Sequence, residues 1–519
     1  MISGNGARGV GVFDPGTDGN VLQGNFIGTD PLGAAAFANV MDGIDISGGA
    51  RSNLIGGTMV GSANVISGNG LCGITHGGAG TDGTIVRGNL IGLDASGLAA
   101  LANGLARVIV YGGARLTQLG GTTPGARNVI SAHHSYDAII TDPGTQANVF
   151  QGNFVGLNAA GTAAVANTTF AGVAVFGGAQ SNTVGGGVGA RNVVSGNASY
   201  GVFISDTNTD TNVVQGNTSG LDPTGTIAIG NGVSGVVIQN AARSNQVGGA
   251  TLGAANLIAS NGTYGVVVFD TGTTNNSIAG NSIFGNGSAG IALVGDNLSR
   301  PAPLLTSAVV GTNTVVNGML TSSPTATFRI EFFANPTGLA TAQGQTFLGA
   351  ISATTGSGGT VTFSAGLSST VPPGQRVTAT ATDPAGNTSR FSSSVTVSTT
   401  DSDGDGLPDQ WELAQFGTLA QSANGDPDGD GSTDMQEFRA GTNPKGSASA
   451  LKVTFASQGG TDVIVGFPSV AARIYRVEMK DSLIQPAWAP LADQLVAAWA
   501  AQSRSPIPAQ PRCANASTE

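Results

Sequence analysis

Apolar residues along most of the chain come in short alternating bursts, such as residues 9–13, 44–46 and 235–238. Alternation with a period of two over about four to six residues predicts β-strands, because successive side chains of a strand point to opposite faces. Gly, Asn, Asp-Pro and Thr-Gly clusters between the bursts favour turns. No window of a dozen residues shows an amphipathic helical period before about residue 408. The sequence therefore predicts a succession of short strands.

A repeat of 64 residues organises the first part of the chain. The tetrapeptide Ile-Ser-Gly-Asn and its variants begin at Ile2, Ile66, Ile130, Val194 and Ile258. A second marker, Val-Leu-Gln-Gly-Asn with variation, keeps the same register and ends at Asn25, Asn89, Asn153, Asn217 and Asn281. A fixed period of this kind is typical of a solenoid. The unit is present four times with part of a fifth.

Short strands that recur at a fixed period, with Asn at corresponding corners, predict a parallel β-helix over residues 1–298. We divide each unit into two coils of about 32 residues. Asn at one corner of successive coils can stack as a hydrogen-bonded ladder, because Asn tolerates left-handed backbone and bonds neighbouring groups. One such series is Asn5, Asn69, Asn197 and Asn261, which His133 interrupts. Asp30, Asp94 and Asp222 are expected to begin type I turns that end at Gly33, Gly97 and Gly225.

The segments 201–205 and 212–217 resemble the pectate-lyase-like family of right-handed parallel β-helix repeat proteins. The resemblance covers more than half of the chain. It implies the fold but not one function, since such scaffolds carry sugar-degrading enzymes, adhesins and passive stalks.

A catalytic site on this scaffold would need a recognisable set of residues. Lyases of the resembling family use Asp clusters with Ca²⁺ and an Arg or Lys base, and the related hydrolases pair Asp residues in several short motifs. The chain has only the segment Asn208-Thr209-Asp210 from these. We interpret His76, His133 and His134 as drift of single repeats rather than as a base or a metal-ligand pair, and Arg87 as a surface substitution, because no carboxylate cluster is recognisable near them. We assign no catalytic residue, and Asp210, His133 and Arg87 would be the first residues to test if activity were found.

Composition and charge narrow the choice of partners. The chain has 519 residues, 83 of them Gly, and a net charge of −11. Residues 401–446 hold ten acidic and two basic residues, a net charge of −8, so most of the acidity is local. Residues 1–300 hold fourteen Asp, nine Arg and no Lys. That balance excludes the basic stripe that nucleic acids require.

Targeting features are absent from the sequence as given. No apolar run approaches the roughly 18–20 residues of a membrane-spanning helix, and the chain opens within the repeat pattern without a signal peptide. We expect a truncated start with the signal peptide missing upstream. Cys72 and Cys513 lie far apart and predict neither a disulfide framework nor a metal site.

The 64-residue pattern ends in the Pro-rich stretch around residues 297–303, and a second domain is predicted over residues 304–399. Alternating strands at 327–333, 361–363 and 376–381 are part of about seven expected strands, a number that favours an antiparallel β-sandwich. Residues 381–389 resemble bacterial immunoglobulin-like modules of secreted surface proteins. The resemblance implies an Ig-like spacer.

Two acidic loops give the sharpest chemical prediction. Counted over twelve residues from Asp401, carboxylates stand at positions 1, 3, 5, 9 and 12 and Gly406 at position 6, which is the pattern of an EF-hand Ca²⁺ loop. Carboxylate oxygens at this spacing surround one hard cation, with a backbone carbonyl at position 7. A second copy starts at Asp426, with Gly431 at the turn. The predicted ligands are Asp401, Asp403, Asp405, Leu407, Asp409 and Glu412, then Asp426, Asp428, Asp430, Ser432, Asp434 and Glu437.

Short helices are expected after the loops, from Pro408 to about Phe416 and from Thr433 to about Ala440. The loops over residues 401–446 resemble the calcium repeats of thrombospondin-type-3 and dockerin-like bacterial modules. The resemblance implies Ca²⁺ as a structural cation, and extracellular modules of this kind bind it weakly. Secretion is expected on this ground.

The end of the chain is predicted as a small β module at 450–492 with strands at 451–455 and 474–478, followed by a disordered tail at 493–519. Trp488 is expected in the core of this module rather than on a sugar-binding surface.

These features predict a secreted or cell-surface, all-β, calcium-binding protein that acts in adhesion or binds polysaccharide along the β-helix. No nucleic acid and no membrane span are expected. A polysaccharide lyase or glycoside hydrolase acting on the β-helix face is the alternative, and a fragment whose functional part lies upstream is a third possibility.

Overall fold

The computed structural model describes the chain except residues 106–107, 133–134, 166–169, 188, 296, 339–341, 460–461, 471–473, 481–488, 491–494, 497–502, 509–512 and 519. It divides into two compact units, one built from residues 1–308 and 312–397 and the other from 309–311 and 398–519. His133, His134 and Trp488 lie outside the described residues. Among the described residues, no helix has the length and apolar character needed to cross a membrane.

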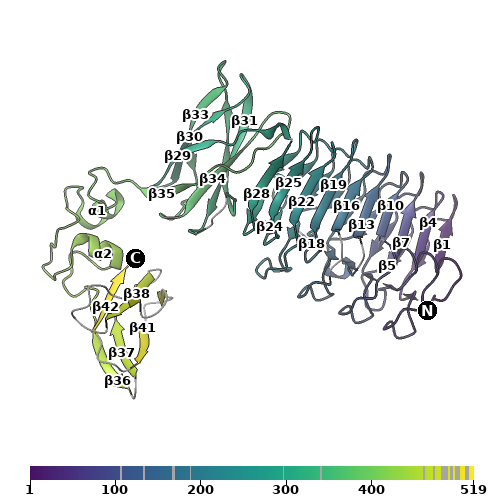
Figure 1. Cartoon of the computed structure of the whole chain (residues 1–519), viewed down its shortest axis with the longest axis horizontal. Coiled ribbons are helices and arrows are strands. Elements are labelled where there is room, and N and C mark those ends of the chain that lie inside the picture. The colour runs from purple at the N-terminus through teal and green to yellow at the C-terminus, as the bar shows by residue number, and fades with distance from the viewer. Residues whose placement is uncertain are drawn as a thin grey trace. The chain divides into compact units, whose positions relative to one another are not determined.

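Residues 1–294 form a parallel β-helix, as the repeat predicts (Figure 1). Each coil gives one strand to each of three parallel sheets. The ten-stranded sheet contains β1 (Val10–Phe13), β4 (Ile44–Ser47), β7 (Ile74–Gly77), β10 (Val108–Tyr111), β13 (Tyr136–Thr141), β16 (Ala171–Phe176), β19 (Tyr200–Ser205), β22 (Ser234–Gln239), β25 (Tyr264–Phe269) and β28 (Ala289–Val294).

The other two sheets of the β-helix have nine strands each. One contains β2 (Val21–Leu22), β5 (Leu54–Gly56), β8 (Ile85–Arg87), β11 (Gln118–Gly120), β14 (Val149–Gln151), β17 (Thr183–Gly185), β20 (Val213–Gln215), β23 (Gln246–Gly248) and β26 (Ser277–Ala279). The other contains β3 (Phe26–Ile27), β6 (Val65–Ile66), β9 (Leu90–Ile91), β12 (Val129–Ile130), β15 (Phe154–Val155), β18 (Val193–Val194), β21 (Thr218–Ser219), β24 (Leu257–Ala259) and β27 (Ser282–Phe284). The 3-10 turn η1 (Pro124–Ala126) lies between β11 and β12, and the 3-10 turn η2 (Asn297–Ser299) follows β28.

Inward-facing Val, Ile and Leu side chains fill the β-helix. In β19, Val202 and Ile204 belong to this core, whereas Phe203 lies in a separate apolar cluster, so successive side chains point to opposite faces of the sheet. In-register pairing, such as Val202 with Val173 and Val236, repeats the same inward position on each coil. The alternating bursts of the sequence are therefore the continuous core of the solenoid.

Buried Asn ladders join the coils and confirm the predicted series. Asn69 accepts a hydrogen bond from Asn39 and donates one to Asn103, across 30 and 34 residues, which together make the 64-residue unit. Asn197 likewise bonds Asn231, which the sequence analysis had not placed in the ladder. Because each unit has two coils, the described rungs of this ladder are Asn5, Asn39, Asn69 and Asn103 before His133, and Asn197, Asn231, Asn261 and Asn286 after it. Two more Asn ladders occupy other corners and contain Asn25, Asn64, Asn89, Asn128, Asn153, Asn192, Asn217, Asn256 and Asn281, and Asn148, Asn182, Asn212, Asn245 and Asn276.

The predicted turns are present at all three Asp positions. The N–H of Gly33 donates to the Asp30 carbonyl at 3.0 Å, and Gly97 and Gly225 do the same to Asp94 and Asp222 at 2.9 Å. The three glycines have φ of 66°, 69° and 76°, a left-handed geometry that other residues adopt only with strain.

His76 is a core residue and not a surface ligand. Its side chain is fully buried in β7, its Nδ1 lies 3.3 Å from the Thr117 hydroxyl, and its Nε2 is buried without a partner. Burial penalises the charged imidazolium and lowers the pKa of His76 to about 4.

This burial predicts an acid-sensitive β-helix. Because unfolded His takes up a proton near pH 6.5 and folded His76 only near 4, the contribution is complete above about pH 6.5 and is lost as pH falls towards 4. We expect a loss of about 2 kcal/mol between about pH 7 and pH 5 from this residue. Urea unfolding at both pH values measures it, and His76→Gln should show a flatter pH dependence. Equal pH dependence in both proteins would contradict the assignment.

Residues 304–399 form a seven-stranded region with antiparallel pairs, in the order β32-β31-β34-β35-β29-β30-β33. The Phe332 ring of β31 packs edge-on against Phe363 of β33 with centroids 5.9 Å apart, although these strands stand far apart in that order. The region therefore folds back on itself around a common core. The strands are β29 (Leu304–Val310), β30 (Thr314–Thr321), β31 (Thr327–Asn335), β32 (Thr346–Thr354), β33 (Thr360–Leu367), β34 (Arg376–Thr382) and β35 (Val395–Thr399).

This region caps the last coil of the β-helix, whereas we had expected a spacer. Gln343 accepts hydrogen bonds from the backbone N–H and side chain of Asn286 and so continues an Asn ladder. Ile283 and Gly344 exchange two backbone hydrogen bonds, and Phe391 is buried in the β-helix core cluster. The cap covers backbone groups and apolar surface that would otherwise lie at an open solenoid end.

The second unit contains the predicted helices, α1 (Asp409–Phe416) and α2 (Asp434–Ala440), followed by short strands. These are β36 (Phe455–Gly459), β37 (Asp462–Phe467), β38 (Ile474–Lys480), β39 (Ala489–Pro490), β40 (Leu495–Val496), β41 (Ser503–Pro508) and β42 (Cys513–Thr518). Within the described parts of residues 493–519, β41 pairs with β37 and β42 pairs with β38. These pairings connect the described parts of the tail to the C-terminal β region.

Candidate metal centre

The first three carboxylates of each loop converge. Oxygens of Asp401, Asp403 and Asp405 lie within 4.8 Å of one another, and those of Asp426, Asp428 and Asp430 do the same. Each loop winds tightly around its first Asp because that carboxylate accepts two backbone hydrogen bonds. Gly404 and Gly406 donate to Asp401 at 2.9 and 3.0 Å, and Gly429 and Gly431 donate to Asp426 at the same distances.

Glycine is needed where the loop reverses. Gly406 has φ of 97° and Gly431 has φ of 91°, values that favour Gly over residues with a Cβ. The next residue closes the turn, since the N–H groups of Leu407 and Ser432 donate at 2.8 Å to Asp405 and Asp430. The assignment of the Leu407 and Ser432 carbonyls as ligands stays a prediction.

The helices carry the last acidic residue of each loop. α2 begins with a capping box, in which the Thr433 hydroxyl accepts from the Gln436 N–H and the Gln436 side chain accepts from the Thr433 N–H. Gly417 and Gly441 end α1 and α2 in left-handed geometry. Trp411 packs between Phe416 and Phe438, with ring centroids 5.7 and 5.5 Å apart. This packing holds the two short helices together.

Glu412 and Glu437, at position 12 of the loops, are fully buried. Among the residues that the structure describes, no group forms a hydrogen bond with either carboxylate oxygen of Glu412 or with the Oε2 atom of Glu437. Burial raises the pKa of Glu412, and the charges of Asp403 and Asp405 raise it further. Burial is also the largest cause of the raised pKa of Glu437, which is about 7. A hydrogen bond from Thr442 lowers this pKa, and the charges of Asp428 and Asp430 raise it.

Buried carboxylates without partners are costly, so they need a compensating charge. Other orphaned atoms are Oδ2 of Asp428 and Oδ2 of Asp430. An all-oxygen set on a tight loop with a terminal Glu fits a hard cation such as Ca²⁺. The residues of both loops therefore fit the predicted metal.

The two loops differ at position 9. Both Asp409 oxygens accept hydrogen bonds from Ser402, at 2.7 Å from its N–H and 2.6 Å from its hydroxyl, and these bonds lower the pKa of Asp409. Asp434 in the second loop is fully buried, and burial raises its pKa. Asp409 is therefore hydrogen-bonded to the start of its own loop, whereas the Asp434 side chain is buried. The spacing of the acidic residues did not predict this difference, although Ser at position 2 of the first loop could have indicated it.

The β-helix residues considered for catalysis have structural contacts. Asp210 Oδ1 accepts the Arg243 N–H at 2.9 Å, and Thr209 is buried and accepts from the Gly178 N–H. Asp18 and Asp82 stand at the equivalent positions of other repeats, and each accepts a hydrogen bond from a backbone N–H of the next coil, that of Arg51 and Arg115, respectively. Asn208-Thr209-Asp210 is therefore a coil corner. Arg87 is half-buried at the end of β8.

The family model that matches this chain covers the two acidic loops. The model of the bacterial TSP3 repeat, a calcium-binding repeat, matches residues 401–418 and 426–445. These ranges contain both loops and both helices. No curated protein matches the chain. The match identifies two repeats of this kind within a much longer chain.

Proposed function

We propose that this chain is an extracellular or cell-surface protein that binds Ca²⁺ through the two acidic loops and binds polysaccharide, in an adhesive role, through its β-helix. The orphaned buried carboxylate oxygens of Glu412 and Glu437 carry the calcium part. The TSP3 match supports both the cation and the location, since such repeats are typical of extracellular proteins. Affinities of about 10⁻⁴–10⁻³ M suit an extracellular module.

A cluster of aromatic side chains on the outer face of the ten-stranded sheet supports the polysaccharide part. We call it the aromatic face, and its members are Tyr136, Phe170, Phe176, Tyr200, Phe203, Tyr264 and Phe269. Tyr200 and Phe203 stack with planes 11° apart, and Phe170 packs edge-on against both. Except for Phe203 these rings are only partly buried. A row of partly exposed rings offers sugar rings an apolar platform with polar edges.

Retention on immobilised polysaccharides, both acidic and neutral and with or without Ca²⁺, tests this function. We expect retention by the purified chain and about a tenfold weaker affinity for Tyr200→Ala, because one ring platform is lost. Phe37→Ala removes an aromatic side chain that is 54% exposed outside the aromatic face and is the matched control. Equal retention of both variants would reject the aromatic face as the binding surface.

The alternative of a polysaccharide lyase or glycoside hydrolase rests on two carboxylates at the opposite end of the same sheet. Asp45 Oδ2 pairs with Arg8 at 2.6 Å, and Asp42 accepts the Cys72 N–H at 3.0 Å. Both charges also raise the pKa of Tyr111, after the larger effect of burial. Incubation of the chain with the same polysaccharides, followed by an assay for cleavage products, decides between the two functions. Release of unsaturated ends or reducing sugar, lost in Asp45→Asn, would favour the enzyme.

A further inference from the structure

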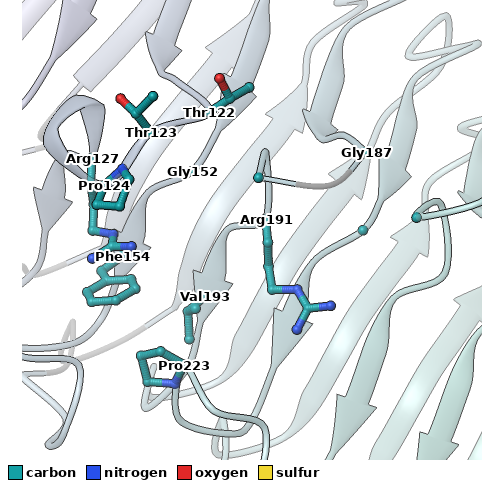
Figure 2. A pocket seen from close by; sticks show the side chains of 13 residues that line it. Thr122, Thr123, Pro124, Arg127, Gly152, Phe154, Gly187, Arg191, Val193 and Pro223 are labelled. Carbon is teal, nitrogen blue, oxygen red and sulfur yellow. The ribbon is translucent and has the colours of Figure 1, made fainter.

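A groove of about 450 Å³ lies beside the nine-stranded sheet that contains β12, β15 and β18 (Figure 2). Its lining combines two cations, two hydroxyls and two apolar rings, namely Arg127, Arg191, Thr122, Thr123, Phe154 and Pro223. Five glycines also line it, which exposes backbone to the groove. The aromatic face lies on strands of the ten-stranded sheet, so the groove is a different surface.

The two arginines occupy the same position of adjacent repeats, 64 residues apart. Arg127 comes two residues before Val129 of β12, and Arg191 comes two residues before Val193 of β18. β15 lies between these strands, so the two positions are two strand spacings apart, or about 9.5 Å. The equivalent residues of the neighbouring repeats are Ala63 and Ala255. The cationic pair is therefore confined to the middle of the β-helix.

Within the described residues, neither the Arg127 guanidinium nor the Arg191 guanidinium forms an ion pair or a hydrogen bond. The Arg127 guanidinium stacks over the Phe154 ring at 3.9 Å, and its Nε is buried without a partner. Burial lowers the pKa of Arg127. Four other described arginines of the β-helix do have partners, which are Asp45 for Arg8 and backbone carbonyls for Arg51, Arg115 and Arg243.

A stacked guanidinium keeps its in-plane N–H groups available. Those N–H groups match a carboxylate or sulfate in a bidentate geometry, and the ring beneath fixes their direction. Figure 2 shows Arg127 lying against Phe154 and Arg191 on the neighbouring part of the groove. The half-buried Arg127 guanidinium carries a desolvation cost that a bound anion would offset, and the exposed Arg191 adds a second positive charge to the same groove.

We propose that this groove binds an acidic polysaccharide, with Arg127 and Arg191 taking the anionic groups of alternate sugars. In an extended two-fold chain, groups on one side recur at every second sugar, a distance close to the separation of the two arginines. The Thr122 and Thr123 hydroxyls and the glycine backbone offer partners for sugar hydroxyls, and Phe154 offers an apolar surface. A nucleic acid would require a longer cationic track.

Isothermal titration of the full chain with a uronate polymer, a sulfated glycan and a neutral glucan tests the proposal. We expect the chain to bind one or both acidic polymers more tightly than the neutral one, because the neutral polymer offers the two arginines no anionic group. Arg127→Gln/Arg191→Gln should weaken that binding by about 100-fold, since each charge-assisted pair contributes about tenfold. Arg51→Gln is the matched control, because Arg51 is exposed and outside the groove. Preference for the uronate or the sulfated polymer identifies the anionic group.

A gain-of-function variant tests the proposal independently, since weaker binding by the double variant could also result from misfolding. Ala255 is exposed and stands 64 residues after Arg191, so Ala255→Arg should add a third cation in register and tighten acidic polymer binding several-fold. The two arginine substitutions should weaken acidic polymer binding by about the same factor when they are made in Tyr200→Ala, which separates the groove from the aromatic face. An acidic polymer affinity that is unchanged in the double variant, or that only equals the affinity for the neutral glucan, would overturn the proposal.

Discussion

Chelation of calcium is expected to unfold residues 401–446 while the β-helix stays folded. Ten carboxylates against two basic residues repel one another, and helices of eight and seven residues are too short to be stable alone. A bound cation supplies the missing charge, so its binding free energy is folding free energy for this segment. Hydrogen exchange with and without chelator measures the effect. The backbone N–H groups of Gly406 and Gly431, which donate to Asp401 and Asp426, should lose protection.

Variants of single carboxylates sharpen this test. Glu412→Gln and Glu437→Gln should each weaken Ca²⁺ binding to their own loop by roughly 100-fold, because each removes a buried negative charge from the ligand set. Asp409→Asn should have a smaller effect, since Ser402 already occupies both Asp409 oxygens. Glu478→Gln, outside both loops, is the matched control. Protection and calcium affinity that are unchanged in all four proteins would reject a structural cation here.

The acidic loops could be predicted from the sequence because their geometry is local. Asp401, Asp403 and Asp405 fall within five residues, so spacing alone determines that their oxygens meet. The behaviour of Asp409 could not be read from spacing, because it depends on competition with the Ser402 hydroxyl. The spacing of ligand residues thus predicts which side chains lie close together, but it does not predict which hydrogen bonds each of them forms.

The coils of the β-helix could be predicted because the 64-residue repeat shows which residues occupy equivalent positions on successive coils. The side-chain contacts between segments far apart in the sequence could not be predicted. Arg127 stacks on Phe154 across a coil, and Gln343 meets Asn286 across 57 residues. Neither contact has a local pattern, since each is set by which coil packs beside which. The cap and the cationic groove therefore emerge only from the structure, whereas the core and the Asn corners follow from the sequence.

Asn153→Ala is expected to destabilise the β-helix by about 4 kcal/mol, because it strands several buried polar groups at once. The Asn153 Oδ1 accepts from both the N–H and the side chain of Asn128, and its Nδ2 donates to the Leu119 and Gln151 carbonyls and to Asn192. Removal of the side chain leaves these neighbours without water to replace the lost bonds, since the position is fully buried. Urea unfolding measures the loss.

The first rung of a ladder offers the matched control for this substitution. Asn5 is exposed and its side chain donates one hydrogen bond, to Asn39 at 2.7 Å, so Asn5→Ala should cost about 1 kcal/mol or less. In a solenoid each coil contacts only its neighbours, so the damage in Asn153→Ala should also be local. Hydrogen exchange should increase most in β12, β14 and β15, and least at the two ends of the β-helix. Equal destabilisation by the two variants would mean that the Asn ladders contribute through backbone conformation at the corners and not through their buried hydrogen bonds.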